Sequence, residues 1–128
     1  MRDERGQALS TLVAVSVVGL LLMCGLVVDG GAQAEAGRRA QLAAALAARA
    51  AVDDTATARL AGTTPQTGRA IAVAHQVLAA HGVEGEVRFV AGRVEVQTST
   101  RVNTVFLSLI GIDTLGAGGT ATAELRDG

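Results

Sequence analysis

The sequence is poor in the residues from which most functional sites are built. Its 128 residues include no tryptophan, no tyrosine, two phenylalanines, one cysteine and two histidines, and all of its basic residues are arginine. A single cysteine excludes an intramolecular disulfide and a cysteine-based metal cage. The chain also lacks the basic stripe and the aromatic stacking platforms of nucleic-acid binders, so we expect no nucleic-acid partner.

The remaining candidates for chemistry form no recognisable motif. His75 and His81 have no cysteine or acidic ligand at metal spacing, which indicates satisfied or solvated histidines. Asp53 and Asp54 are adjacent, and adjacent helical residues point in different directions. The glycine-rich stretch 116–119 lacks the residues that follow in a phosphate-binding loop, so a flexible turn is expected there. We therefore expect no enzyme: no catalytic residue, no cofactor, no metal and no small-molecule substrate.

The most informative feature is an uncharged apolar run over residues 8–28. A helix of that length is about 31 Å long, which matches the hydrocarbon core of a bilayer. The run contains only three hydroxyl side chains, and in a helix these can bond the carbonyl one turn earlier. The pattern predicts one transmembrane helix over 8–28, a short cytoplasmic leader over 1–7 and an extracytoplasmic domain over 29–128. Arginines near the two ends balance, so charge does not decide the orientation, and the leader is assigned to the cytoplasm because exported proteins commonly keep such short tails inside.

A secretory signal peptide is the alternative interpretation. Ala32-Gln33-Ala34 has the small-x-small form of a signal-peptidase site, and cleavage between Ala34 and Glu35 would release a small secreted binding module. The apolar run is, however, longer than the usual hydrophobic region of about 7–15 residues, and the leader Arg2-Asp3-Glu4-Arg5 has balanced side-chain charge. These two features favour a retained anchor.

Beyond the apolar run the pattern predicts an α+β fold with helices on one face of a small antiparallel sheet of about three strands. Asp29-Gly30-Gly31 is a polar break that ends or loosens the first helix. The expected elements are a helix over 29–62, a helix over 66–81, a hairpin over 84–102, a short helix over 104–110 and a strand over 119–126. In the first of these, Leu42, Leu46 and Ala50 form an apolar ridge with Ala43 and Ala47, either a packing face within the domain or an assembly face.

Both ends of the chain resemble a known family. The N-terminal residues are Arg5-Gly6-Gln7-Ala8 before the apolar run, then Gly25-Leu26-Val27-Val28-Asp29-Gly30-Gly31, then alanine-rich sequence with Arg38-Arg39 and Gln41. Near the C-terminus stand Phe106-Leu107-Ser108-Leu109-Ile110-Gly111 and Ala121-Thr122-Ala123-Glu124. These stretches resemble TadE/TadG-like proteins of the Tad (tight adherence, Flp) type IV pilus machinery.

The resemblance implies a pseudopilin or a minor pilus-assembly component in the cell membrane. Its partners would be the membrane and other pilus or secretion-system subunits. Prepilins of this class are cut after a glycine, here between Gly6 and Gln7, and usually carry a glutamate five residues past the cut. This chain has Thr11 there, so the resemblance favours an uncleaved, membrane-resident assembly factor. Small residues allow helices to approach closely in membranes, and we expect Ser10 and Ala14 to form such a packing face.

Overall fold

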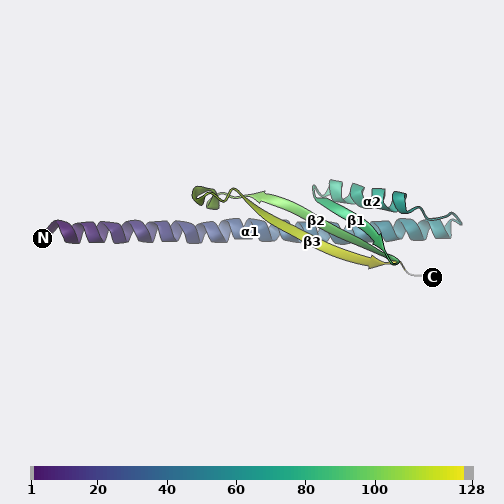
Figure 1. Cartoon of the computed structure of the whole chain (residues 1–128), viewed down its shortest axis with the longest axis horizontal. Helices are drawn as coiled ribbons and strands as arrows, with labels where there is room; N and C mark the ends of the chain where they lie inside the picture. Colours follow the sequence, from purple (N-terminus) through teal and green to yellow (C-terminus); the bar gives the residue numbers. More distant parts are fainter. Residues whose placement is uncertain (1, 126–128) are drawn as a thin grey trace.

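The computed structural model describes residues 2–125 and shows the α+β arrangement predicted from the sequence. Helix α1 (Arg2–Leu60) runs the length of the molecule, and the other elements lie beside it from its middle to its C-terminal end (Figure 1). They follow in the order α2 (Thr67–Ala80), β1 (Glu84–Val90), β2 (Arg93–Asn103), the 3-10 helix η1 (Leu107–Ile110) and β3 (Thr114–Glu124). We call residues 33–125 the head and residues 8–28 the apolar segment.

Helix α1 continues without interruption from the apolar segment into the head. The helices predicted over 8–28 and 29–62 are therefore one helix, and the polar break at Asp29-Gly30-Gly31 does not end it. Glycine in a helix interior is less favourable than alanine by about 1 kcal/mol. Contacts from Asp29 and Gln33 to the rest of the chain fix both sides of the glycine pair and compensate for it.

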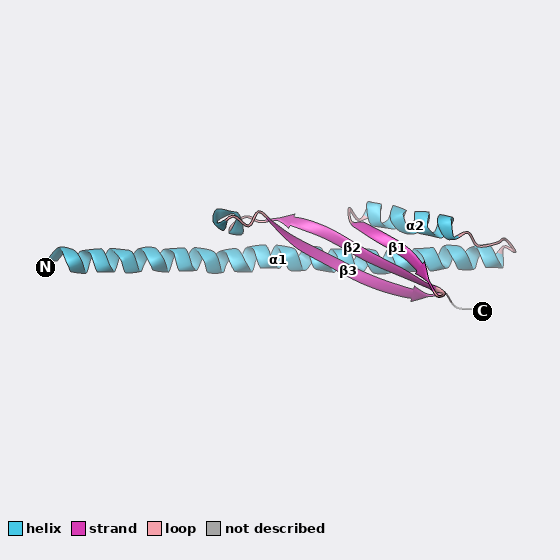
Figure 2. Ribbon diagram, viewed as in Figure 1, coloured by secondary structure: helices cyan, strands magenta, loops and turns pink. Residues whose placement is uncertain are grey.

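The three strands form an antiparallel sheet in the order β1-β2-β3 (Figure 2). Strands β1 and β2 make the predicted hairpin. Its turn consists of Ala91 and Gly92, with φ of 50° and 77°. Positive φ at both turn residues matches the right-handed twist of the strands, and alanine is an uncommon choice there.

Strand β3 begins earlier than predicted, at Thr114 instead of residue 119. The glycine-rich stretch 116–119 is not a flexible turn, because Gly118 and Gly119 pair with Ser99 and Thr98 of β2. A side chain at Gly119 would meet the backbone of α1, and one at Gly118 would meet the carbonyl oxygen of Thr98. The glycines therefore permit close packing. The last residue of the predicted strand, 126, lies outside the described residues.

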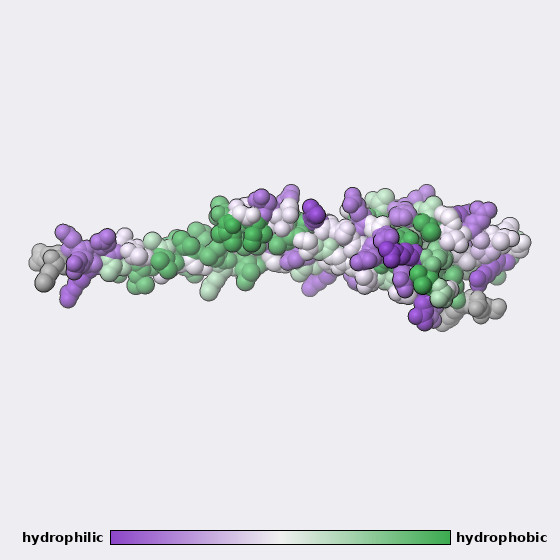
Figure 3. All heavy atoms as spheres, in the orientation of Figure 1, coloured by the Kyte–Doolittle hydropathy of each residue, from purple (hydrophilic) through white to green (hydrophobic). Residues whose placement is uncertain are grey.

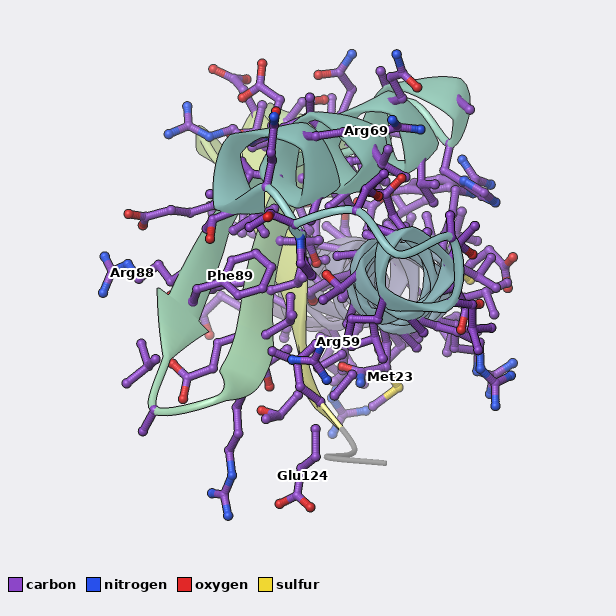
Figure 4. The ribbon with its side chains drawn as sticks, turned by 90° about the vertical axis from the view of Figure 1, so that its right-hand side faces the viewer. Met23, Arg59, Arg69, Arg88, Phe89 and Glu124 are labelled. Atoms are coloured by element: carbon purple, nitrogen blue, oxygen red, sulfur yellow. The ribbon has the colours of Figure 1, made fainter. Side chains whose placement is uncertain are left out.

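Both long helices pack on one face of the sheet, α1 over β2 and β3 and α2 beside β1. Figure 4 looks along α1 and shows Phe89 on the side that faces the helices and Arg88 pointing away. The opposite face carries exposed polar side chains from all three strands: Glu86, Arg88, Glu95, Gln97, Thr120 and Thr122. This alternation gives a half-buried antiparallel sheet with one solvated face.

The core is built mainly from alanine and valine. Buried residues of the core cluster are Ala40, Ala43, Ala44, Ala47, Ala48 and Ala51 of α1, Ala70, Ala74 and Leu78 of α2, and Val83, Val87, Val94 and Val96. The ridge predicted on α1 is thus wrong in part, because Ala43 and Ala47 are buried whereas Leu42 and Leu46 are 56% and 38% exposed. Helix α1 lies so close to the sheet and to α2 that methyl groups fill the space between them.

Helix α2 matches its prediction within about one residue at each end. Gly82 follows it with φ of 65°, and the Val83 N–H donates to the Leu78 carbonyl oxygen at 3.0 Å, which closes the last turn. Arg69 of α2 pairs with Asp54 of α1 at 3.1 Å. His75 is exposed, and the His81 Nδ1 lies 2.9 Å from the Val77 carbonyl oxygen.

Candidate functional site: a membrane anchor and its junction with the head

The apolar segment of α1 is exposed over most of its surface, apart from the buried Gly25. Its large side chains from Leu9 to Val28 are all exposed, and Val27 is 74% exposed. Figure 3 shows this apolar surface between the polar N-terminal turns and the more polar head. Helix α1 is the one helix in the described part of the chain that is long and apolar enough to cross a membrane. A helix that is apolar on every side and unburied is typical of a membrane span.

Two of the three hydroxyl side chains in the apolar segment have hydrogen-bond partners inside the helix. Thr11 donates from Oγ1 to the Gln7 carbonyl oxygen at 2.8 Å, and Ser16 donates from Oγ to the Leu12 carbonyl oxygen at 2.8 Å. The expected bonds to the preceding turn are confirmed for these two residues. Groups bonded in this way can be placed in hydrocarbon without an unsatisfied donor.

Asp29, the residue after the apolar segment, joins α1 to the loop that contains η1. Asp29 is only 2% exposed. One carboxylate oxygen accepts the Val105 N–H at 2.8 Å, and the other accepts those of Phe106 at 3.0 Å and Leu107 at 2.7 Å. The carboxylate thus does for η1 what an N-cap side chain does for a helix, although it comes from a distant part of the sequence.

These hydrogen bonds lower the pKa of Asp29. The Val105 N–H has the largest effect, burial of the carboxylate opposes it, and the N–H groups of Leu107 and Phe106 lower the pKa further. All three bonds favour the ionised form. Asp29 therefore stabilises the junction as a carboxylate.

Gly25 provides a second contact, one turn before Asp29. A Cβ at this position would lie 2.7 Å from the Cβ of Phe106. Because real Cβ atoms do not approach so closely, only glycine lets the Phe106 side chain lie against α1 here. Gly25 and Asp29 together fix the loop of residues 104–113, which we call the η1 loop, to the end of the apolar segment.

Two glutamines of α1 cover the free edge of β3. The side-chain amide of Gln33 donates to the Gly116 carbonyl oxygen at 2.7 Å. That of Gln41 donates to the Thr120 carbonyl oxygen at 2.6 Å and accepts the Thr120 N–H at 3.0 Å. The eight residues from Gln33 to Gln41 and the four from Gly116 to Thr120 both extend about 12–13 Å. The two glutamines therefore reach backbone groups that are equally spaced along β3. An edge covered in this way is closed to pairing with another strand.

A buried threonine joins the same helix to the middle of the sheet. The Thr98 hydroxyl lies 3.0 Å from the carbonyl oxygens of Ala40 and Gly119, and it accepts the Gly119 N–H at 3.0 Å. The residue is 3% exposed, so these bonds form away from water, where an unpaired hydroxyl is unfavourable. Thr98 therefore fixes the position of α1 across β2 and β3.

Replacing Gln41 by methionine is expected to destabilise the head by about 1 kcal/mol, because the Thr120 N–H and carbonyl lose their partners but stay open to water. The measurement is thermal unfolding of the full chain in detergent micelles, followed by circular dichroism. Gln76→Met, at an exposed position of α2, is the matched control and should leave the transition unchanged. Equal transitions for the two variants would contradict the role of Gln41.

The residues predicted as sites lie apart along α1. Gly6 and Gln7 are exposed in its first turns, Ser10 and Ala14 are exposed one turn apart in the apolar segment, and Ala34 and Glu35 are exposed inside the continuous helix. Sequence reasoning missed the residues that hold α1 to the η1 loop and to the sheet, which are Asp29, Gln33, Gln41 and Thr98. One sequence signal was available for Asp29, which is a single acidic residue directly after a membrane-length apolar run.

The structure joins a helix long and apolar enough to cross a membrane directly to the head. In the described residues, 2–125, no group of three or more His, Cys, Asp or Glu side chains is placed to hold a metal ion. No protein-family model, no curated protein and no solved structure matches this chain.

Proposed function

We propose that the protein is a single-pass membrane protein with a structural role in a Tad (Flp) type IV pilus or related secretion machinery, as a pseudopilin-like or minor assembly component with its head outside the cytoplasm. The observation that carries the proposal is the exposed apolar segment, which continues as the central helix of the head. The TadE/TadG-like pattern around Gly6 and around Asp29 supplies the choice of machinery.

Exposed apolar side chains on the head support a role in assembly. Leu42 and Leu46 project from α1 outside the core, on the helix that also forms the anchor. Two exposed leucines one turn apart on the same helix are suited to contact with a neighbouring subunit. We expect no catalysis from this protein, because its role requires only insertion, packing and contact.

The geometry of the junction favours a retained anchor over a secreted module. Cleavage after Ala34 would remove Gly25, Asp29 and Gln33 and leave three N–H groups of the η1 loop without their partner. Cleavage after Gly6 would leave every one of these contacts intact. A secreted module starting at Glu35 would therefore lose part of its own structure.

The test is the intact mass and N-terminal residue of the native protein, recovered separately from membranes and medium. We expect a membrane protein that retains the apolar segment, and protease added to intact cells should digest its head. A start at Gln7 in the membrane fraction would identify a processed pilin. A protein that starts at Glu35 and is found in the medium would overturn the proposal in favour of the secreted binding module.

Changing Ser10 and Ala14 together to leucine is expected to reduce co-purification with pilus components several-fold and to leave membrane insertion unchanged. Bulky side chains would separate helices that pack through small residues, whereas leucine is as apolar as the bilayer requires. The measurement is recovery of partner subunits after mild detergent extraction.

The matched control replaces Ser16 and Gly19, two small residues on the opposite side of the same helix, by leucine. This variant should keep its partners. Unchanged co-purification of the Ser10 and Ala14 variant would refute the predicted packing face.

A further inference from the structure

The η1 loop exposes a cluster of large apolar side chains. Leu109 is 75% exposed, and the other exposed members are Val105, Ile110 and Ile112. Asp113, at the C-terminal end of the η1 loop, is its one charged residue. A cluster of this kind on a loop marks a binding surface, because single apolar residues on a surface are common but neighbouring ones are not.

The position of the loop indicates what it contacts. Figure 1 shows the short η1 turn as the part of the head that reaches farthest toward the N-terminal end of α1. Phe106 lies against Gly25, which belongs to the apolar segment, and Asp29 binds the loop directly after that segment ends. If residues 8–28 cross the bilayer, the loop lies at the boundary between lipid tails and headgroups.

Hydrogen bonding within the loop fits this location. The N–H groups of Val105, Phe106 and Leu107 bind Asp29. Those of Thr104, Leu109, Gly111 and Ile112 bind carbonyl oxygens of the loop itself. The hydroxyls of Thr104 and Ser108 bind the carbonyl oxygens of Ile112 and Val105. Irregular backbone that meets lipid must satisfy its polar groups internally, whereas a loop in water has no such need.

We propose that the η1 loop is a second membrane contact, which inserts the side chains of Val105, Leu109, Ile110 and Ile112 into the lipid interface beside α1. The apolar surface of the anchor is continuous with that of the loop (Figure 3). Surface segments of this type bury their apolar side about 5–10 Å into the boundary of headgroups and tails. The proposal rests on the membrane anchoring proposed above and deepens it, because it sets how close to the bilayer the head stands.

The test uses the full chain in phospholipid vesicles and single tryptophan reporters, since the natural sequence has no tryptophan or tyrosine. Leu109→Trp reports on the loop. Leu12→Trp reports on the anchor, and Val90→Trp, next to the hairpin turn, reports on the far end of the head. The vesicles contain phosphatidylcholine and phosphatidylglycerol with acyl chains brominated near the headgroup, which quench a tryptophan that touches them.

We expect quenching of Leu12→Trp and Leu109→Trp, with a fractional loss for Leu109→Trp several-fold larger than for Val90→Trp. Quenching at Leu12→Trp without quenching at Leu109→Trp would overturn the loop contact and leave the anchor standing. Quenching at neither would refute the anchor itself. A blue-shifted Leu109→Trp that brominated lipid does not quench would show that protein covers the loop, and would also overturn the proposal.

Discussion

Replacing Gly119 by alanine is expected to destabilise the head by about 2–3 kcal/mol and to lower its unfolding midpoint by roughly 10–20 °C. The new Cβ would lie 2.4 Å from the Cα of Gln41 and 2.9 Å from the Ala40 backbone. Those neighbours are helix backbone and cannot rotate away as a side chain can. The helix must therefore move off β3, which strains the bonds of Thr98 and Gln41.

Gly116→Ala is the matched control, in the same strand and with nothing within 4 Å of its added Cβ. It should change stability by no more than about 0.5 kcal/mol. Both variants are measured as full chains in detergent micelles, by thermal unfolding followed by circular dichroism. Equal midpoints for the two alanine variants would show that α1 does not contact β3 as closely as described.

Replacing Asp29 by asparagine is expected to release the η1 loop from α1 while the rest of the head stays folded. Asparagine keeps one acceptor oxygen and places an NH₂ group where the aspartate accepts N–H groups, so at least one of the three donors loses its partner. The measurement is hydrogen exchange over residues 104–113, which should become several-fold faster. Exchange in α2 should stay unchanged.

The effect of Asp29→Asn should depend on pH in a defined direction. The hydrogen bonds hold the pKa of Asp29 in the folded chain below its usual value, with the Val105 N–H as the largest cause. The stabilisation is therefore complete above the ordinary aspartate pKa of about 3.9 and is lost as the pH falls through the lowered folded value. Wild type and variant should differ at neutral pH and converge in strong acid. Glu35→Gln, at an exposed position of α1, should match wild type at every pH.

The local patterns of the sequence predicted much of the fold. Alternation in 84–102 located the hairpin, and the loop before Gln66 together with Gly82 bounded α2. The ridge on α1 was misassigned because a leucine is ordinarily more buried than an alanine. Which of them packs inward depends on how closely the sheet approaches, and that distance is set by Gly119, far away in the sequence. A glycine that permits contact and a glycine that permits flexibility look the same in a sequence.

The junction could not be predicted for a related reason. Asp29 accepts hydrogen bonds from Val105, Phe106 and Leu107, which are more than seventy residues away. The sequence around Asp29 therefore does not indicate these partners. Local rules treat an acidic residue before two glycines as the end of a helix. Here the acidic residue binds a returning loop, and that contact helps to carry the helix past the glycines.

Because α1 is one continuous helix, it can transmit rotation along its whole length. If the apolar segment spans a membrane as proposed, a rotation of α1 within the bilayer turns the head through the same angle, because the helix continues unbroken from one to the other. Ser10 and Leu46 are about ten helical turns apart, so at about 3.6 residues per turn they face nearly the same direction. A neighbouring subunit that packs against the Ser10 side of α1 in the bilayer would therefore also face Leu46 on the head. The Ser10–Leu46 side of α1 would then transmit both rotation and alignment from the membrane to the head.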